Sequence, residues 1–228
     1  MTARTGPAAS PAPEAPNVSE VLDGRGDPPA REAVSRAAAA LAAGGVVALP
    51  TDTVYGIAAL PGLPGATDRL FVLKGRAADV PLAVLCASAD QALALADPAA
   101  LTDEVRRIAE RLWPGPLTLV LPRRPGLDYA LGEPPTTVGV RCPDHAVVRA
   151  LAAEVGPLAT TSANRHGEPT PPTAAEVAAT FGTRLALVLD GGPLPGTPST
   201  VVDATGPDWR VLRAGELPLA AITAAAAR

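Results

Sequence analysis

The sequence predicts an α/β protein built on an open, twisted, mixed β-sheet with flanking helices. Short apolar runs that end in small polar or turn residues alternate along the chain with helical patterns, as in α/β folds. Several connections between the expected strands are too short for a helical crossover, so antiparallel neighbours are expected beside parallel ones. With 228 residues, the chain is long enough for one domain with a substantial core.

The two ends of the chain differ in composition from its middle. Residues 1–29 are rich in Ala, Pro, Gly and Ser and show no apolar period, which predicts a disordered leader. Residues 30–215 are expected to form the folded domain. Residues 216–228 are expected to be a C-terminal tail.

The first half of the domain is expected to begin with a helix and a strand. Residues 31–43 are Ala-rich, with Val34 and Leu41 on one side, and Gly44 ends the helical pattern. Residues 46–49 form an apolar run that stops at Pro50, as a buried strand would. Similar patterns predict helices at 65–74, 90–96 and 103–112 and a strand at 82–86.

The second half opens with the rigid turn Trp113-Pro114-Gly115-Pro116, which leads into an expected strand at 117–121. A helix at 144–155 is expected to be capped by Asp144, and a helix at 173–181 shows the capping-box spacing of Thr173 and Glu176. The remaining apolar runs predict strands at 137–142, 157–161, 185–189, 199–203 and 210–213.

Composition excludes several classes of protein. The net charge of −4 argues against a protein that coats nucleic acid by charge alone. Cys86 and Cys142 lack the spacing of a zinc site and are expected to be buried free thiols, and two histidines are too few for a His-based metal site. The chain has no apolar run of about 18 residues and no apolar signal core, so no membrane association and a cytoplasmic location are expected.

Polar side chains gather where the expected strands end. Thr51, Asp52 and Thr53 follow the first strand, and Thr160, Thr161, Ser162 and Asn164 follow a later one. Each cluster taken singly is also ordinary turn chemistry. Lys74 is the only lysine among 19 basic residues and lies two positions before Arg76, which suggests a site that needs a compact ammonium group. Because no glycine-rich phosphate loop is present, charged side chains and hydroxyls would have to bind any polyanion.

Six strings in order resemble the YrdC-like family, in particular its threonylcarbamoyl-AMP synthases, over residues 30–215. They are Leu49-Pro50-Thr51-Asp52-Thr53-Val54-Tyr55-Gly56, Leu73-Lys74-Gly75-Arg76, Trp113-Pro114-Gly115-Pro116-Leu117-Thr118, Val138-Gly139-Val140-Arg141, Thr161-Ser162-Ala163-Asn164 and Pro198-Ser199-Thr200-Val201.

The resemblance implies a YrdC-like fold with a large positive concave face, and a nucleotidyltransferase reaction. L-threonine, bicarbonate or CO2, and ATP with Mg2+ would give L-threonylcarbamoyladenylate and pyrophosphate. The product would serve the N6-threonylcarbamoyladenosine modification of tRNA. The resemblance also suggests tRNA, the threonylcarbamoyl-transferase complex and double-stranded RNA as partners, and it assigns no metal ligand.

The resemblance also assigns residues. Lys74 and Arg76 would be catalytic. The expected ATP contacts are Lys74, Arg76, Thr137, Ser162, Asn164, Thr170 and Arg213. The expected threonine contacts are Thr53, Arg141, Thr160 and Ser199.

Departures from the family pattern leave two other activities open. Val80 stands where the family often has an ATP-side Asn, Leu85 where it often has a threonine-side His, and Arg213-Ala214-Gly215 replaces an Arg-Pro-Gly string. One alternative is an RNA-binding paralogue without synthase activity. Another is carbamoyl transfer in hydrogenase-cofactor assembly, against which the lack of fused zinc-finger or acylphosphatase segments argues.

Overall fold

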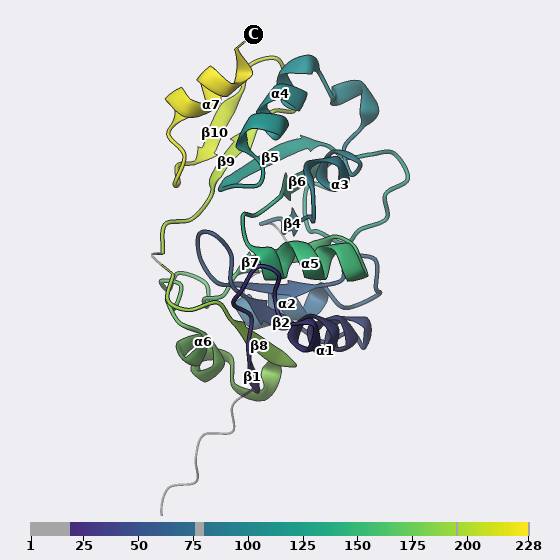
Figure 1. Ribbon diagram of the computed structural model, residues 1–228. Coiled ribbons are helices and arrows are strands. Elements are labelled where there is room, and N and C mark those ends of the chain that lie inside the picture. Colours follow the sequence, from purple (N-terminus) through teal and green to yellow (C-terminus); the bar gives the residue numbers. More distant parts are fainter. Residues whose placement is uncertain (1–18, 76–79, 195, 228) are drawn as a thin grey trace, which may run out of the picture.

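The computed structural model describes residues 19–75, 80–194 and 196–227, which form one mixed sheet with helices on both faces (Figure 1). The strands are β1 Val21–Asp23, β2 Val47–Leu49, β3 Gly56–Ala59, β4 Ala83–Leu85, β5 Leu117–Pro122, β6 Thr137–Arg141, β7 Leu158–Ser162, β8 Leu187–Asp190, β9 Thr200–Asp203 and β10 Arg210–Arg213. The helices are α1 Arg31–Ala42, α2 Asp68–Lys74, α3 Ala89–Leu93, α4 Asp103–Leu112, α5 Ala146–Val155, α6 Ala174–Phe181 and α7 Leu219–Ala226, with 3-10 turns at Pro98–Ala100 and Gly182–Arg184.

The strand order is β1-β8-β2-β3-β7-β4-β6-β5-β9-β10. Pairs β1/β8, β2/β8, β4/β6 and β5/β9 are parallel, and the other pairs are antiparallel, which confirms the predicted mixed sheet. Neighbours such as β3 and β7 lie about a hundred residues apart in the chain, so the sheet brings distant segments side by side.

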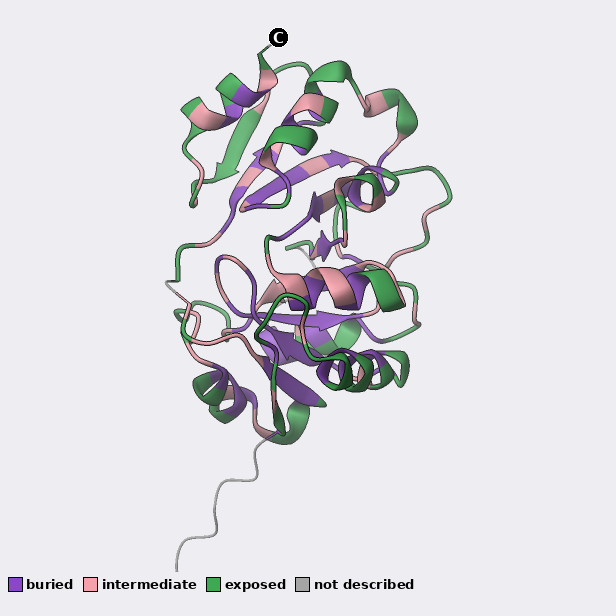
Figure 2. Cartoon of the chain, viewed as in Figure 1, coloured by how far each residue is buried: buried purple, intermediate pink, exposed green. Residues whose placement is uncertain are grey.

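The core lies on both faces of this sheet. On one face, α1 and α5 pack against each other over alternate residues of β2, β7 and β8. On the other face, α2, α3, α4, α6 and α7 cover the remaining strand residues. Figure 2 shows the buried strands between helices whose outer surfaces are exposed. Helices α1 and α5 do not extend over β5, β6 and β9. On the face of the sheet that these two helices cover, the part over β5, β6 and β9 is therefore open to form a site.

Two elements lie where no element was predicted at the ends of the chain. β1 falls within the predicted leader, where Val21 pairs with Val188 of β8. α7 falls within the predicted tail and packs on α4. The folded unit therefore extends beyond residues 30–215 in both directions. Neither segment carries a long apolar period, so the sequence did not predict either element. Each is instead stabilised by a partner far away in the chain. Residues 1–18 of the predicted leader lie outside the described residues.

Local predictions differ from the structure at two further places. β3, which the sequence did not predict, begins at Gly56, and Gly56 pairs with Leu49 of β2 across the connection formed by residues 50–55. Asp144 does not cap α5: the cap position is His145, without a side-chain bond, and Asp144 instead pairs with Arg149 at 2.7 Å. The capping box of α6 is confirmed, since the Thr173 hydroxyl accepts from the Glu176 amide. Among the described residues, no helix is long and apolar enough to cross a membrane.

Candidate active site

A cavity of about 550 Å³ lies on the open part of the α1/α5 face, over β4, β5, β6 and β7. Its wall contains most of the residues that the sequence singled out, which come from six separate segments. They are Thr53, Thr137, Arg141, Thr160, Ser162, Asn164, Thr170, Ser199 and Arg213. Within the described part of the chain, the charged residues of its lining are Arg141, Glu168 and Arg213. We call this space the sheet cavity.

The turn after β2 is built around the hydroxyl of Thr51. This oxygen accepts hydrogen bonds from the amides of Thr53 and Val54, both at 3.1 Å, and contacts the Thr53 hydroxyl at 2.9 Å. Such local side-chain bonds favour a turn over continued strand. Because Pro50 ends the strand and Thr51 closes the turn, Thr53 is buried with its hydroxyl in the wall of the sheet cavity.

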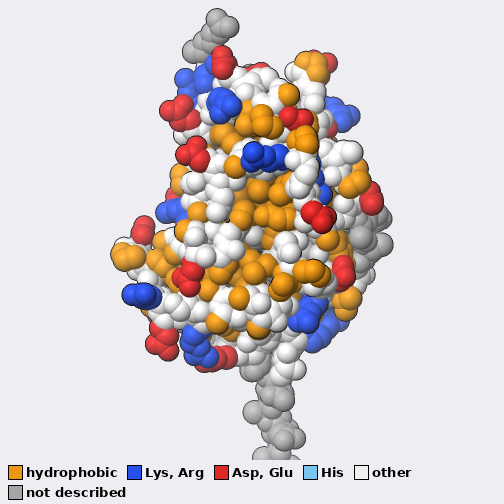
Figure 3. All heavy atoms as spheres, turned by 90° about the vertical axis from the view of Figure 1, so that its right-hand side faces the viewer, with side chains coloured by type: hydrophobic (Ala, Val, Ile, Leu, Met, Phe, Trp, Pro, Cys, Tyr) orange, Lys and Arg blue, Asp and Glu red, His pale blue; other side chains and the backbone are white. Residues whose placement is uncertain are grey.

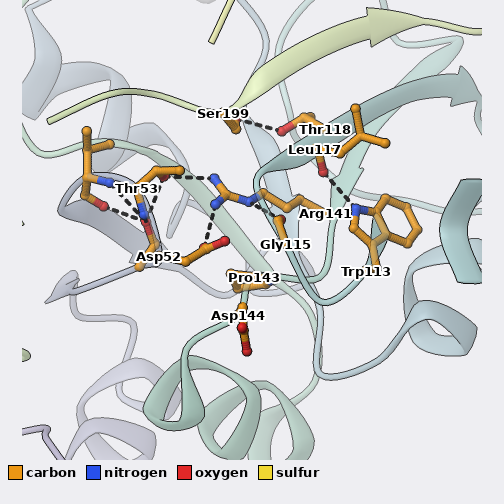
Figure 4. Close-up of polar contacts among 12 residues, drawn as sticks. Asp52, Thr53, Trp113, Gly115, Leu117, Thr118, Arg141, Pro143, Asp144 and Ser199 are labelled. Carbon is orange, nitrogen blue, oxygen red and sulfur yellow. Dashed lines mark hydrogen bonds and ion pairs between the residues drawn. The ribbon is translucent and has the colours of Figure 1, made fainter. Parts of the chain in front are cut away.

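Three residues from two segments of the chain hold Arg141 in place (Figure 4). Its Nε donates to the carbonyl of Gly115 at 3.1 Å, one terminal nitrogen to the hydroxyl of Thr53 at 3.1 Å, and the other to Oδ1 of Asp52 at 2.5 Å. The side chains of Arg141 and Asp52 are only 6% and 13% exposed. No other bond from this guanidinium is made within the described residues, so one N–H on each terminal nitrogen is available, which suits a carboxylate.

Burial lowers the pKa of Arg141 below its ordinary value, and the neighbouring Asp52 carboxylate opposes this change. Arginine stays protonated under such conditions. The wall of the sheet cavity therefore carries a fixed positive charge whose orientation is determined by the protein.

Ser199 lies in another part of the wall, beside Thr118 of β5 and Arg213 of β10. Its hydroxyl contacts Oγ1 of Thr118 at 3.0 Å and accepts from Arg213 at 3.0 Å, and its carbonyl accepts two more bonds from the same guanidinium. Arg213 thus faces the sheet cavity while it anchors Ser199. Thr118 was not assigned from the sequence, although a lone threonine in the apolar run Leu117–Pro122 marks it as a polar position on one face of β5.

Gly215 presses against the backbone of Ser199. A Cβ at Gly215 would lie 2.3 Å from the Pro198 carbonyl oxygen and 2.4 Å from the Ser199 carbonyl carbon. Contacts this short with backbone cannot be relieved by a side-chain rotation.

We expect Gly215→Ala to displace Ser199 and to lower the free energy of unfolding by about 1–3 kcal/mol, the usual cost of overpacking. Urea unfolding measures this change. Gly206→Ala is the matched control, because a Cβ at Gly206 meets nothing within 4 Å. Equal stability of the two variants would contradict the predicted role of Gly215.

Lys74 binds residues that form a further part of the cavity wall. Its side chain is buried, and its Nζ donates to the carbonyls of Ser162 and Asn164 at 2.9 and 2.7 Å and to Oδ1 of Asn164 at 2.8 Å. The hydroxyls of Ser162 and Thr170 donate to the same Oδ1, at 2.6 and 3.3 Å. Lys74 is not among the residues that line the sheet cavity, so it contacts residues of the lining rather than belonging to it.

The other predicted residues are placed as follows. Thr137 and Thr160 face the sheet cavity from β6 and β7. Arg76 lies outside the described residues. Val80 and Leu85, which stand where the family often has Asn and His, both line the cavity and make these parts of its wall apolar.

The sequence analysis placed Asp52 among the polar residues that follow the first strand but assigned it no contact with a ligand. The structure gives it another task, since its carboxylate is the ion-pair partner of Arg141. Its place between Thr51 and Thr53 is the signal that could have found it. Within the described residues, no group of three or more His, Cys, Asp or Glu side chains could hold a metal ion.

Comparison with known proteins gives consistent matches over most of the chain. Residues 39–215 match the family model Sua5_yciO_yrdC, which is described as "Telomere recombination". A protein of Mycobacterium tuberculosis is 41% identical over 180 residues, which cover 78% of this chain and 82% of that protein. The threonylcarbamoyl-AMP synthase of Pyrococcus abyssi is 40% identical over 180 residues, but the match covers 77% of this chain and only 52% of that enzyme.

Among solved structures, the crystal structure of P. abyssi Sua5 complexed with L-threonine superimposes with a TM-score of 0.83 at 37% identity. The match covers 90% of this chain and 60% of that one.

Proposed function

The chain belongs to the Sua5/YciO/YrdC family, and on that premise we propose that it is a threonylcarbamoyl-AMP synthase. The observation that carries this proposal is Arg141, a buried and firmly held guanidinium in the wall of the sheet cavity with two N–H groups left for a ligand. These match a carboxylate such as that of threonine. The similarity to an enzyme solved with L-threonine supports the same assignment.

The reaction joins three substrates. The amine of threonine condenses with bicarbonate to a carbamate and water, and a carbamate oxygen attacks the α-phosphorus of ATP. The bond to the β-phosphate oxygen breaks, and pyrophosphate leaves with its electron pair. Carbamate and triphosphate repel one another, so the main task of the protein is to hold both in line and to offset their charge.

The residues of the sheet cavity divide this task. Arg141 and Thr53 would hold the threonine carboxylate and hydroxyl at one end, with Ser199 and Thr160 near them. Arg213, Thr137, Thr170 and the turn of Ser162 and Asn164 would face the nucleotide. Mg2+ would enter with the phosphate oxygens of ATP, which are hard ligands that it prefers, and would supply further charge neutralisation.

The product would supply a threonylcarbamoyl group to a tRNA-modifying transferase, which makes tRNA a downstream partner. A separate role in binding double-stranded RNA receives less support. On the face shown in Figure 3, Lys and Arg side chains lie interspersed with Asp and Glu around hydrophobic side chains, and they form no continuous basic area there. Electrostatic RNA binding depends on such an area.

The proposal is tested by measuring pyrophosphate release from ATP and identifying the nucleotide product by mass. We expect release that requires both L-threonine and bicarbonate and a product with the mass of threonylcarbamoyl-AMP. Release that proceeds equally without threonine, or none at all from folded protein, would refute the assignment. Salt-dependent binding of RNA without turnover of ATP would favour the RNA-binding alternative instead.

A further inference from the structure

Gly139 lies in the floor of the sheet cavity at the middle of β6. Its backbone is not in the left-handed region, so its conformation does not require glycine. A Cβ at this position would meet its nearest neighbours, Thr118, Ala83 and Val120, at 3.7 to 3.9 Å, which is ordinary van der Waals contact. The protein itself therefore has room for a side chain at Gly139.

Glycine in the interior of a strand is nevertheless costly. It weakens the strand through backbone entropy and the loss of packing, and it often marks a place where another molecule approaches closely. Since neither backbone conformation nor packing explains glycine here, the empty space above Gly139 is the remaining explanation.

The position of Gly139 along β6 shows what that space is for. Thr137, Gly139 and Arg141 line the sheet cavity, while Val138 and Val140 point into the core on the other face. Alternate residues of a strand are about 7 Å apart, so Gly139 lies midway between a threonine on the nucleotide side and the arginine on the amino-acid side.

The residue beside Gly139 on one neighbouring strand is also small. Gly139 is in register with Ala83 on β4 and Val120 on β5, and Ala83 is in register with Thr160 on β7. Ala83 and Gly139 together form a stretch of small residues in the cavity floor, between the larger side chains of Thr160 and Val120. We call Ala83 and Gly139 the low floor.

We propose that Gly139 determines whether the two substrates can meet, because it keeps the low floor clear where the carbamate approaches the α-phosphorus. This inference rests on the proposed function. The attacking oxygen and the phosphorus must come within about 3–3.5 Å, and a displacement of about 1 Å can cost about 100-fold in rate. A methyl group on the floor would leave each end of the sheet cavity intact but would lift the reacting groups apart.

The test compares Gly139→Ala with wild type and with Gly206→Ala, whose added Cβ meets nothing within 4 Å. Calorimetry measures the binding of L-threonine alone and of a non-hydrolysable ATP analogue alone. It then measures the binding of threonine in the presence of the analogue and bicarbonate. We expect each ligand alone to bind Gly139→Ala within about 3-fold of wild type. We expect joint binding to weaken by at least 10-fold and pyrophosphate release to fall by about 100-fold.

A second variant reaches the low floor from the next strand. Ala83→Val adds two methyl groups beside Gly139 and is expected to reproduce the same pattern, with single ligands retained and turnover lost. Both variants are expected to keep the thermal unfolding temperature of wild type to within about 4 °C.

Each alternative result overturns the inference. Turnover of Gly139→Ala at the wild-type rate would show that the space is not needed, and weak binding of one ligand alone would assign Gly139 to that ligand. Loss of folding in Gly139→Ala would mean that packing requires the glycine. If wild type releases no pyrophosphate, the proposed function fails, whereas loss of joint binding in Gly139→Ala would still identify the low floor as the meeting point of two ligands.

Discussion

Lys74→Met is expected to lower the rate of pyrophosphate release by at least 100-fold and also to destabilise the protein. Methionine keeps much of the length of the side chain but removes the ammonium group that binds the carbonyls of Ser162 and Asn164 and the amide oxygen of Asn164. Hydrogen bonds to charged groups contribute about 1.5–3 kcal/mol each, and it is also costly to leave the partly buried acceptors of Ser162 and Asn164 without their donor. We expect a loss of about 3 kcal/mol or more in the free energy of unfolding.

Two measurements separate this role from a purely electrostatic one. Urea unfolding gives the stability, and the KM for ATP gives the effect on the nucleotide side. If Lys74→Met lost activity but unfolded like wild type, Lys74 would act only through its charge on the ligand, and its structural role would be refuted. Lys74→Arg keeps the charge but cannot place a compact donor between the two carbonyls, so it is expected to be almost as damaging.

Arg141→Lys is expected to raise the KM for threonine by about 100-fold with a smaller effect on the KM for ATP. Lysine retains a positive charge but cannot reproduce a fork that contacts Gly115, Thr53 and Asp52 at once. A carboxylate would then lose the two N–H groups that Arg141 leaves available, and a guanidinium that donates two hydrogen bonds binds a carboxylate more strongly than a point charge does. Steady-state kinetics with threonine and ATP varied in turn measures the two effects.

A double variant separates binding from folding at this pair. Arg141→Met leaves the carboxylate of Asp52 buried without a partner, which typically costs about 3–5 kcal/mol. Adding Asp52→Asn removes that charge and is expected to restore most of the stability while the threonine affinity remains low. Asp144→Asn, which breaks the more exposed pair with Arg149, is the control and is expected to change neither property. If the double variant recovered threonine binding, Arg141 would not be the carboxylate ligand.

The strands and helices that the sequence predicted well are those with strong local signals. Residues 103–112 form α4 as predicted, because acidic residues at its start and an amphipathic pattern act within the segment itself. The strand Thr137–Arg141 alternates between residues that face the cavity and apolar residues that face the core, as expected for a strand with one face covered. The elements that prediction missed, β1, β3 and α7, have short or small-residue sequences and are stabilised by partners far along the chain.

For the candidate site too, residues in local motifs were predicted, whereas roles that depend on distant contacts were not. Thr53, Arg141, Ser162 and Ser199 were chosen from motifs, and the structure brings all four to one cavity. The roles of Lys74 and Asp52 were not readable in this way, since each acts through a neighbour: Lys74 through Ser162 and Asn164, and Asp52 through Arg141. A sequence shows which side chains are present but not which of them are in contact.

The sequence alone thus determined the class of fold, the polar residues at strand ends and the family to which those residues point. These features depend on local patterns of side chains, which act over a few residues. Tertiary structure alone decided that two distant segments hold Arg141, that Gly139 leaves a low floor and that Lys74 supports the wall rather than lining it. Such arrangements depend on contacts between segments up to about ninety residues apart, and only the pairing of the strands fixes them.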